Sequence, residues 1–473
     1  MQFLSLQFIV SFTIFFWCYW LVCKSKTSQN FVLLIASYLF YGLYDWRFVP
    51  LLFLTSMAAY TAGICFDKCD GTRLVLHKTG RWWISCVSIF FCVAILCYFK
   101  YTNFFLQSIS DLTGGGYNAL NIVLPVGISF YTFSAISYIV DCYQKKIEPT
   151  KDLVVCLLYT SFFPAILSGP IHKATEQLPQ YLKVRSFNDS LIISGFKDFL
   201  WGAFMKLCVA DRIGMYVDAV YGNMAQHNGT TLLLASIFYT IQIYADFAGY
   251  SLMAIGCGKL LGIRLQTNFI RPYFSKTITE FWSKWHMSLT GWFKNYVYFP
   301  LGGNRVGKGR WIFNIMIVFL LSGFWHGAAY TFIIWGAIHG MAQVIEKLLY
   351  GKSIKSIPQK LNVINGIRML ITFSIVSFAW IFFRLPSLQD AMSAISRIFS
   401  SPGLPYTDMH TMVFALSSFV ILLCKDVSEE WLPNLRLLQS NKCWVSFLTC
   451  LFLVAYILLF GKLNSESFIY FQF

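Results

Sequence analysis

The sequence predicts an all-α polytopic membrane protein, and three observations lead to this fold class. Hydrophobic residues make up 57% of the chain and charged residues only 12%, whereas soluble proteins carry about 25% charged residues. Long uncharged runs recur from end to end, and about 20 apolar residues suffice for a membrane-crossing helix. The runs are continuous and do not alternate, which excludes a transmembrane strand barrel. Their lengths predict about 11–13 transmembrane or re-entrant helices.

Residues 1–120 predict peripheral N-terminal helices. The first apolar run, residues 3–23, is followed rather than preceded by Lys24 and Lys26. A retained first span with an outside N-terminus is therefore expected, not a cleaved signal peptide. The next expected elements are apolar runs at residues 33–44, 48–66 and 82–99 and a glycine-rich turn at 114–116.

The net charge of +16 is explained by membrane topology. Basic clusters near residues 25, 75 and 147 alternate with loops that carry little charge. Positively charged loops prefer the cytoplasmic side, so no nucleic-acid partner is needed to explain the charge. This pattern places the N-terminus outside, and both termini are expected to be extracytoplasmic.

A single membrane-embedded domain is expected over residues 1–473, with a catalytic core at 121–350 and C-terminal helices at 351–473. One stretch of the core, residues 194–221, carries too many charges for a lipid-facing helix. We expect it to be partly interfacial, or its charges to be paired inside the bundle: Lys197, Asp198, Lys206, Asp211 and Arg212. The run 231–261 contains Asp246 and several glycines, which favour close helix packing.

The most informative stretch begins TEFWSKWHMSLTGWFKNYVYFPLGGNR, from Thr279 to Arg305. As one continuous helix it places aromatic residues and His286 along a single stripe. An interfacial helix with aromatic rings at headgroup level is the alternative. The following run, residues 311–345, has no charged residue. One helix of about 35 residues would be roughly 50 Å long, so the run is expected to turn back near Ser322 or Gly327, beside His326.

Two other patterns are rejected as sites. Residues 302–309, GGNRVGKG, fit G-x-x-x-x-G-K, but Gly309 stands where the phosphate-binding motif needs Ser or Thr. We expect a glycine-rich turn whose basic residues could meet phosphates of a donor. Cys65 and Cys69 have no partner pair or nearby His, so no metal site is expected.

The central stretch, with SGFWHGAAYTFIIWGAIHG further on, resembles the membrane-bound O-acyltransferase (MBOAT) family. Upstream motifs LPVGISFYTF, YIVDCY, SFFPAILSGPI and IQIYADFAGYSLMAIG, and the terminal FIYFQF, resemble the branch that acetylates bacterial polysaccharides. The resemblance runs in order from about Leu124 onward. Ser283 and Lys284 replace two Arg that are usual in the branch, and Leu252 replaces an acidic residue.

The resemblance implies helices ringed around a central tunnel and a multi-pass protein of the bacterial cytoplasmic membrane. It implies His326, in the WHG motif, as the essential histidine and His286 as the second. It further implies an acyl group that comes from cytoplasmic acetyl-CoA, without a bound cofactor, and reaches an extracytoplasmic polysaccharide. That acceptor is an alginate-like exopolysaccharide or peptidoglycan, reached directly or through a separate extracytoplasmic transferase.

Acyl transfer from a thioester needs a base, and a neutral histidine suits that role at cellular pH. His326 is expected to be the base. His286 is expected to orient the substrate, to bind the acyl carbonyl or to hold His326. Further candidate residues for substrate or donor binding are Trp325, Trp285, Asn304, Arg305 and Asp246. Packing and loop roles are expected for His339 and His172.

Two other functions stay open at this point. A transporter or flippase for a cell-envelope glycan precursor could use the same histidines as a polar pathway. A non-catalytic membrane scaffold would tolerate loss of His326.

Overall fold

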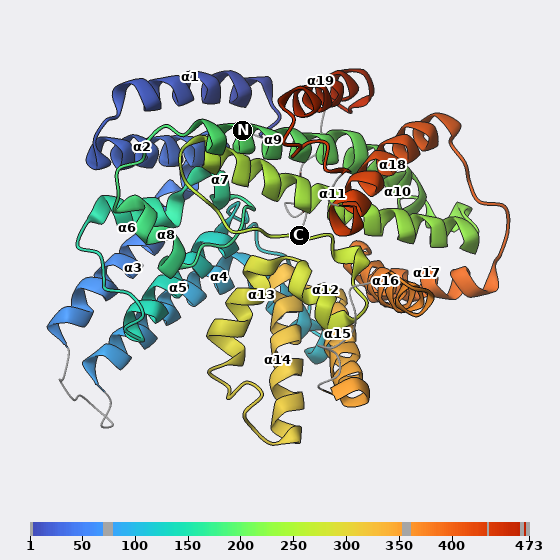
Figure 1. The fold of residues 1–473 in the computed structure, drawn as a ribbon. Helices are drawn as coiled ribbons and strands as arrows, with labels where there is room; N and C mark the ends of the chain where they lie inside the picture. The colour runs from blue at the N-terminus through green and yellow to red at the C-terminus, as the bar shows by residue number, and fades with distance from the viewer. Residues whose placement is uncertain (1–2, 70–78, 352–360, 433–434, 464–467, 470–473) are drawn as a thin grey trace. The chain divides into compact units, whose positions relative to one another are not determined.

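A computed structural model of the chain describes residues 3–69, 79–351, 361–432, 435–463 and 468–469. Helices form the regular structure of these residues, and no strand occurs among them. The predicted all-α fold is thus confirmed (Figure 1). The basic cluster near residue 75 and most of the FIYFQF tail lie outside the described residues.

Seven described segments are long and apolar enough to cross a membrane, so the chain is a multi-pass membrane protein. They are Lys26–Lys68, Gly80–Thr113, Gly229–Leu260, Tyr330–Tyr350, Val363–Arg384, Thr411–Trp431 and Cys443–Phe460. Two apolar helical segments, Leu6–Val22 and Leu153–Ile166, are shorter. The predicted number of helices is higher because it includes short and charged segments, and because Lys26–Lys68 contains two helices.

The chain divides into two compact units. Unit 1 holds residues 1–196 and 254–266, and unit 2 holds residues 197–253 and 267–473. The helices that lie wholly in unit 1 are α1 (Leu6–Val22), α2 (Lys26–Asp45), the 3-10 helix η1 (Trp46–Phe48), α3 (Val49–Lys68), α4 (Gly80–Thr113), α5 (Ile128–Tyr143), α6 (Leu153–Ser161), α7 (Phe163–Ile166) and α8 (Ala174–Tyr181). Helices α9 (Asp189–Phe204) and α11 (Gly229–Leu260) contribute residues to both units.

Unit 2 contains the predicted site. Its elements are the π-helix η3 (Met205–Ala210), α10 (Asp211–Tyr221), the 3-10 helices η4 (Met224–Gln226) and η5 (Pro272–Phe274), α12 (Ile278–Lys284), α13 (Met287–Phe293), the π-helix η6 (Lys294–Tyr298), α14 (Lys308–His326), α15 (Tyr330–Tyr350), α16 (Val363–Arg384), α17 (Leu388–Ser400), α18 (Met409–Trp431) and α19 (Cys443–Phe460).

Helices α14 and α15 form a close antiparallel pair (Figure 1). A Cβ at Gly323 would collide with the carbonyl oxygen of Phe332, and a Cβ at Gly336 with that of Phe319. Glycine at both positions therefore lets the two backbones touch. The predicted turn is confirmed at Gly327, where α14 has just ended at His326.

The continuous helix predicted from Thr279 is wrong. Helix α12 ends at Lys284, α13 begins at Met287, and His286 between them has a left-handed φ of 42°. This conformation is disfavoured by about 1–2 kcal/mol for a residue with a Cβ. It is held by backbone hydrogen bonds from Met287 N to Asn268 O (2.9 Å) and from Ile270 N to Lys284 O (3.0 Å). A pairing with a distant segment thus overrides the helical periodicity.

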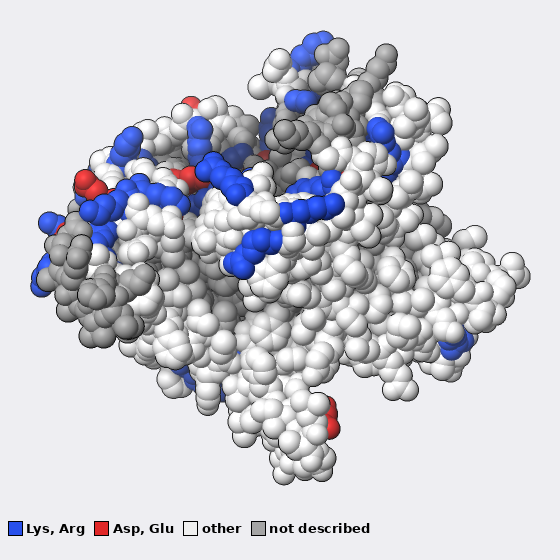
Figure 2. Space-filling view, turned by 90° about the horizontal axis from the view of Figure 1, so that it is seen from below, with Lys and Arg blue, Asp and Glu red and all other residues white. Residues whose placement is uncertain are grey.

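Two further predictions are confirmed. The glycine-rich turn precedes α14, with φ values of 100° at Gly302 and 56° at Gly303. Of the charges predicted to be paired in the stretch 194–221, Lys206 and Asp211 are paired inside unit 2, since Lys206 Nζ lies 2.7 Å from a carboxylate oxygen of Asp211 and 2.7 Å from one of Asp246. On the face drawn in Figure 2, Lys and Arg side chains predominate over Asp and Glu, as the net charge predicts.

Candidate functional site

The structure brings the two predicted histidines together inside unit 2. The ring centroids of His286 and His326 are 6.3 Å apart. His286 is 0% exposed and His326 is 2% exposed. One histidine precedes α13 and the other is the last residue of α14. The break between α12 and α13 and the end of α14 therefore position the pair.

Hydrogen bonds fix the orientation of the His286 ring. Its Nδ1 lies 3.2 Å from Asn268 Oδ1, and the same oxygen accepts from the backbone N–H (3.2 Å) and Oγ (2.9 Å) of Ser288. The backbone N–H of Ser288 can only donate, so this atom of Asn268 is the oxygen. His286 Nδ1 therefore carries a hydrogen and donates it. Asn268 is held in turn by its Nδ2, which donates to Ser251 Oγ at 3.1 Å.

The environment of His286 keeps the imidazole neutral. Its ring packs against Phe247, with centroids 4.6 Å apart, and stacks on Phe269 at 6.4 Å. Burial disfavours the charged form and lowers the pKa of His286 to about 3. The ring is thus uncharged at cellular pH.

His326 is surrounded by aromatic rings. Its centroid lies 4.9 Å from Trp325, 5.0 Å from Trp335 and 5.4 Å from Phe383. Trp325 also lies 6.0 Å from His286. Trp325 thus lies beside both histidines, and among the further candidate residues it is the one that packs against the pair.

The other predicted residues lie elsewhere in unit 2. Trp285 is fully buried against Phe269 and Trp380, with centroids 5.0 and 5.1 Å away. Asn304 and Arg305 are exposed in the turn before α14. His326 is at the far end of that helix, about 27 Å away at 1.5 Å per residue.

Asp246 has partners that indicate a structural role. Its carboxylate pairs with Lys206 and also accepts a 2.8 Å hydrogen bond from the backbone N–H of Ile469. Phe468 packs on Tyr250 and Phe247, with centroids 4.6 and 5.6 Å away. Because Phe247 packs against His286, the C-terminal residues Phe468 and Ile469 stabilise the helix that forms one wall of the site.

A cavity of about 310 Å³ lies among α12, α13, η6, α14 and α15. Its lining is mainly apolar, with Trp282, Phe293 and Phe319 among the larger side chains. Lys294 and Lys347 also line it, and no carboxylate of the described residues belongs to the lining. Ser322, four residues before His326, lines it too, and residues four apart share a helix face.

The remaining buried histidines occupy packing positions. His339 Nδ1 accepts a 3.3 Å hydrogen bond from Trp282 Nε1, and its ring lies 5.0 Å from Trp335. His172 is buried in a loop of unit 1 with Nδ1 3.4 Å from Tyr159 O. Burial lowers the pKa of His172 to about 4. Among the described residues, no cluster of three or more His, Cys, Asp or Glu could hold a metal ion.

Sequence reasoning missed Asn268, Ser288 and Phe247. Phe247 and Ser288 lie inside the quoted motifs, but neither residue type indicates a role there, and Asn268 is 18 residues from the histidine that it orients. Only the turn at His286 brings them together, and no sequence signal indicates that turn.

The chain is similar in sequence to known proteins over most of its length. Residues 150–385 match the model of the membrane-bound O-acyltransferase family. The chain is 32% identical to the probable alginate O-acetylase of Pseudomonas putida, over 95% of this chain and 96% of that protein. It is 30% identical to the peptidoglycan O-acetyltransferase of Helicobacter pylori, over 95% and 92%. It is 29% identical to the teichoic acid D-alanyltransferase of Bacillus subtilis, over 56% and 69%.

Proposed function

Since this chain belongs to the membrane-bound O-acyltransferase family, we propose that it transfers an acetyl group from cytoplasmic acetyl-CoA toward hydroxyls of an extracytoplasmic polysaccharide. The acceptor is an alginate-like exopolysaccharide or peptidoglycan, the polymers named for the relatives. The observation that carries the proposal is the pair of buried histidines, 6.3 Å apart.

In the proposed reaction His326 acts as the general base. It takes the proton of the acceptor hydroxyl while the hydroxyl oxygen attacks the thioester carbonyl. The new C–O bond forms, the C–S bond breaks, and the proton passes from His326 to the leaving thiolate. His286 orients the hydroxyl, and Trp325 keeps water from both rings. A neutral base in a dry pocket supports such a transfer.

We place the donor in the cavity that Lys294 and Lys347 line. Two ammonium groups at an apolar cavity suit an anionic molecule with an apolar arm. Such a donor would place its phosphates toward the lysines and the basic turn of Arg305, and its thioester toward Ser322 and His326.

The location and partners follow from the reaction. A cytoplasmic donor and an outside acceptor require a path across the bacterial cytoplasmic membrane, which a central tunnel would supply. The alternation of basic and weakly charged loops leads us to expect both termini outside. A separate extracytoplasmic transferase is the expected partner wherever the polymer cannot reach His326 itself.

The test follows thiol release from acetyl-CoA by the purified protein in its lipids, and acetyl transfer to each polymer. His326→Ala is expected to lower kcat by roughly 10²–10⁴-fold, the usual contribution of a general base. His227→Ala, in a loop of unit 2, is the control and should keep wild-type activity. Equal turnover in wild type and His326→Ala would exclude His326 as the base, and glycan transport without thioester cleavage would overturn the enzyme function.

A further inference from the structure

The two paired segments around His286 each contain one residue in a left-handed conformation. Of three non-glycine residues with positive φ in the described chain, two are His286 (42°) and Arg271 (41°). Both lie in segments joined by the backbone hydrogen bonds between Ile270 and Lys284 and between Met287 and Asn268. Left-handed conformations persist only where the surroundings hold them. Contacts with residues outside these segments add to the stabilisation that these hydrogen bonds supply.

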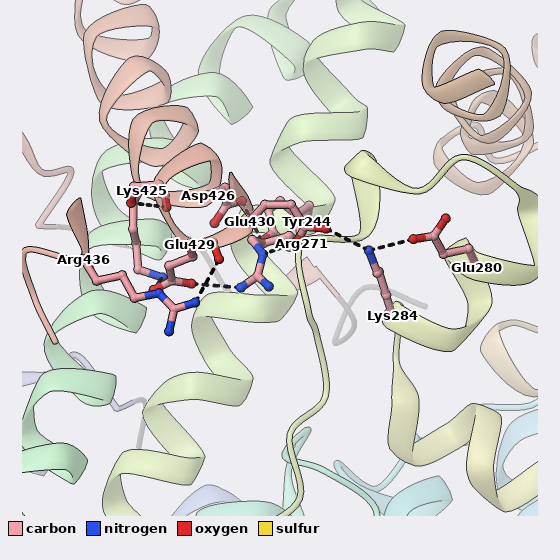
Figure 3. Close-up of polar contacts among 10 residues, drawn as sticks. Tyr244, Arg271, Glu280, Lys284, Lys425, Asp426, Glu429, Glu430 and Arg436 are labelled. Atoms are coloured by element: carbon pink, nitrogen blue, oxygen red, sulfur yellow. Dashed lines mark hydrogen bonds and ion pairs between the residues drawn. The ribbon is translucent and has the colours of Figure 1, made fainter. Parts of the chain in front are cut away.

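The surroundings include a charged cluster at the end of α18 (Figure 3). Glu430 Oε2 lies 2.7 Å from Arg271 Nε, and its other oxygen, Oε1, lies 3.4 Å from Lys284 Nζ. One carboxylate thus binds both segments of the pairing, one through each oxygen. Glu429 reinforces the first contact, since its Oε2 lies 3.1 Å from Arg271 Nη1. We call Arg271, Lys284, Glu429 and Glu430 the α18 latch.

The latch is connected to the aromatic wall near His286. Lys284 also pairs with Glu280 of α12 at 2.9 Å, so the charge at the end of α12 is held from two sides. One turn before Glu430, Asp426 accepts a 3.0 Å hydrogen bond from Tyr244, whose ring lies 6.4 Å from Trp285. Trp285 is the residue directly before His286.

We propose that Glu430, with Arg271 and Lys284, is a positioning group for His286. It touches neither histidine; it acts by fixing the paired segments in which the left-handed turn at His286 is formed. The catalytic consequence rests on the proposed function. When the latch opens, His286 no longer meets His326 in the reactive geometry, while the donor cavity is unchanged.

The test compares Glu430→Gln with Lys425→Gln. Lys425 pairs with Glu429 at 2.9 Å within α18, so its substitution removes an ion pair from the same helix that does not cross to the paired segments. Glu430→Gln is expected to lower kcat by roughly 10- to 100-fold, since small misplacements of catalytic groups cost about that much. The KM for acetyl-CoA should stay within about twofold. Lys425→Gln should behave like wild type.

A second measurement does not depend on activity. Backbone hydrogen exchange in the peptide that covers residues 268–287 is expected to accelerate in Glu430→Gln and not in Lys425→Gln. Exchange in α14 should not change in either variant. Lys284→Arg keeps the charge, so its kcat and its hydrogen-exchange rate should equal those of wild type. Lys284→Met removes the charge and should show the same lower kcat and faster exchange as Glu430→Gln.

The proposal is overturned if Glu430→Gln leaves both kcat and exchange at wild-type values. It is equally overturned if Lys425→Gln produces the same changes, or if exchange rises throughout unit 2, which would indicate general destabilisation. A wild-type protein without thioester turnover would contradict the proposed function, but the exchange experiment would still decide whether the latch holds the segment.

Discussion

Two groups of paired charges lie in unit 2, and they differ in how deeply they are buried. In the first, Lys206 lies between Asp211 and Asp246, and all three side chains are 7% exposed or less. In the α18 latch, the side chains of Arg271, Lys284 and Glu430 are 13–22% exposed. Water can therefore replace part of a lost contact in the latch but not in the buried triad.

This difference assigns different tasks to similar residues. Removing one partner of a buried ion pair leaves an uncompensated charge and is strongly destabilising. Partly exposed pairs contribute less to overall stability than buried ones, but they can hold a local conformation. We infer that the buried triad stabilises the fold of unit 2, whereas the latch stabilises the left-handed turn at His286 within it.

The largest effect is expected for Lys206→Met, which leaves two buried carboxylates without their cation. The free energy of unfolding should fall by about 3–5 kcal/mol, as measured by thermal or denaturant unfolding in detergent. Lys425→Met, which removes a partly exposed lysine, is the control and should change stability by less than about 1 kcal/mol. Similar stabilities of the two variants would contradict the distinction between the clusters.

A smaller effect is expected for Asp246→Asn. The amide oxygen can still accept the hydrogen bond from Ile469, and Lys206 retains Asp211, so the lost interaction is one charged contact. The expected loss is about 1–3 kcal/mol. Asp246→Leu should lose more, because the buried N–H of Ile469 would then have no acceptor at this position. If Asp246→Asn abolished thioester turnover without loss of stability, Asp246 would belong to the reaction instead.

The latch should respond to salt where the triad does not. Raising the ionic strength to about 1 M shortens the screening length to about 3 Å, which weakens partly exposed ion pairs more than buried ones. Hydrogen exchange in residues 268–287 should therefore increase with NaCl in wild type, while the exchange of η3 around Lys206 should not. In Glu430→Gln the salt dependence should be reduced. Equal salt dependence of both regions would contradict the comparison.

The smallest effect is expected in the pH dependence of stability, through the neutral ring of His286. An unfolded chain binds a proton at histidine below pH about 6.5, whereas burial lowers the pKa of His286 to about 3. Between these values the unfolded state binds more protons, so stability decreases as the pH falls. His286→Asn should show a shallower decrease between pH 7 and pH 5 than wild type, measured by thermal unfolding. Parallel curves would show that His286 does not contribute.

The sequence predicts the helical fold and, through the family resemblance, the two histidines of the site, but not the geometry between them. Composition and the lengths of the apolar runs reflect burial in lipid, which favours apolar residues wherever a helix crosses the membrane. The turn at His286 is formed instead by a pairing with a distant segment, since Asn268 binds Met287 and the His286 ring; in our proposal Glu430, 144 residues from His286, holds that pairing. The stripe through Trp282, Trp285 and His286 fits a helix, and local periodicity carries no information about those distant contacts.

The charged residues are an intermediate case. The unusual charges around Lys206 indicate that partners must exist, since such groups are costly in a membrane. Their identity could not be read from spacing, because Asp246 belongs to another helix, α11. No sequence pattern indicates the proposed role of Glu430, because carboxylates are common near the ends of membrane-spanning helices.

The hydrogen bond between His286 and Asn268 gives the site a chemical direction. With Nδ1 committed as the donor to Asn268 Oδ1, a neutral His286 ring offers only the lone pair of Nε2 to a substrate. That nitrogen can receive a hydrogen bond from a hydroxyl but cannot give one to a carbonyl oxygen. A bound acceptor would thus donate a hydrogen bond from its O–H group to His286 Nε2. The carbonyl oxygen of the thioester would accept hydrogen bonds from other groups. An ester product, which has lost that hydroxyl, would be held less well by His286 than the alcohol that enters.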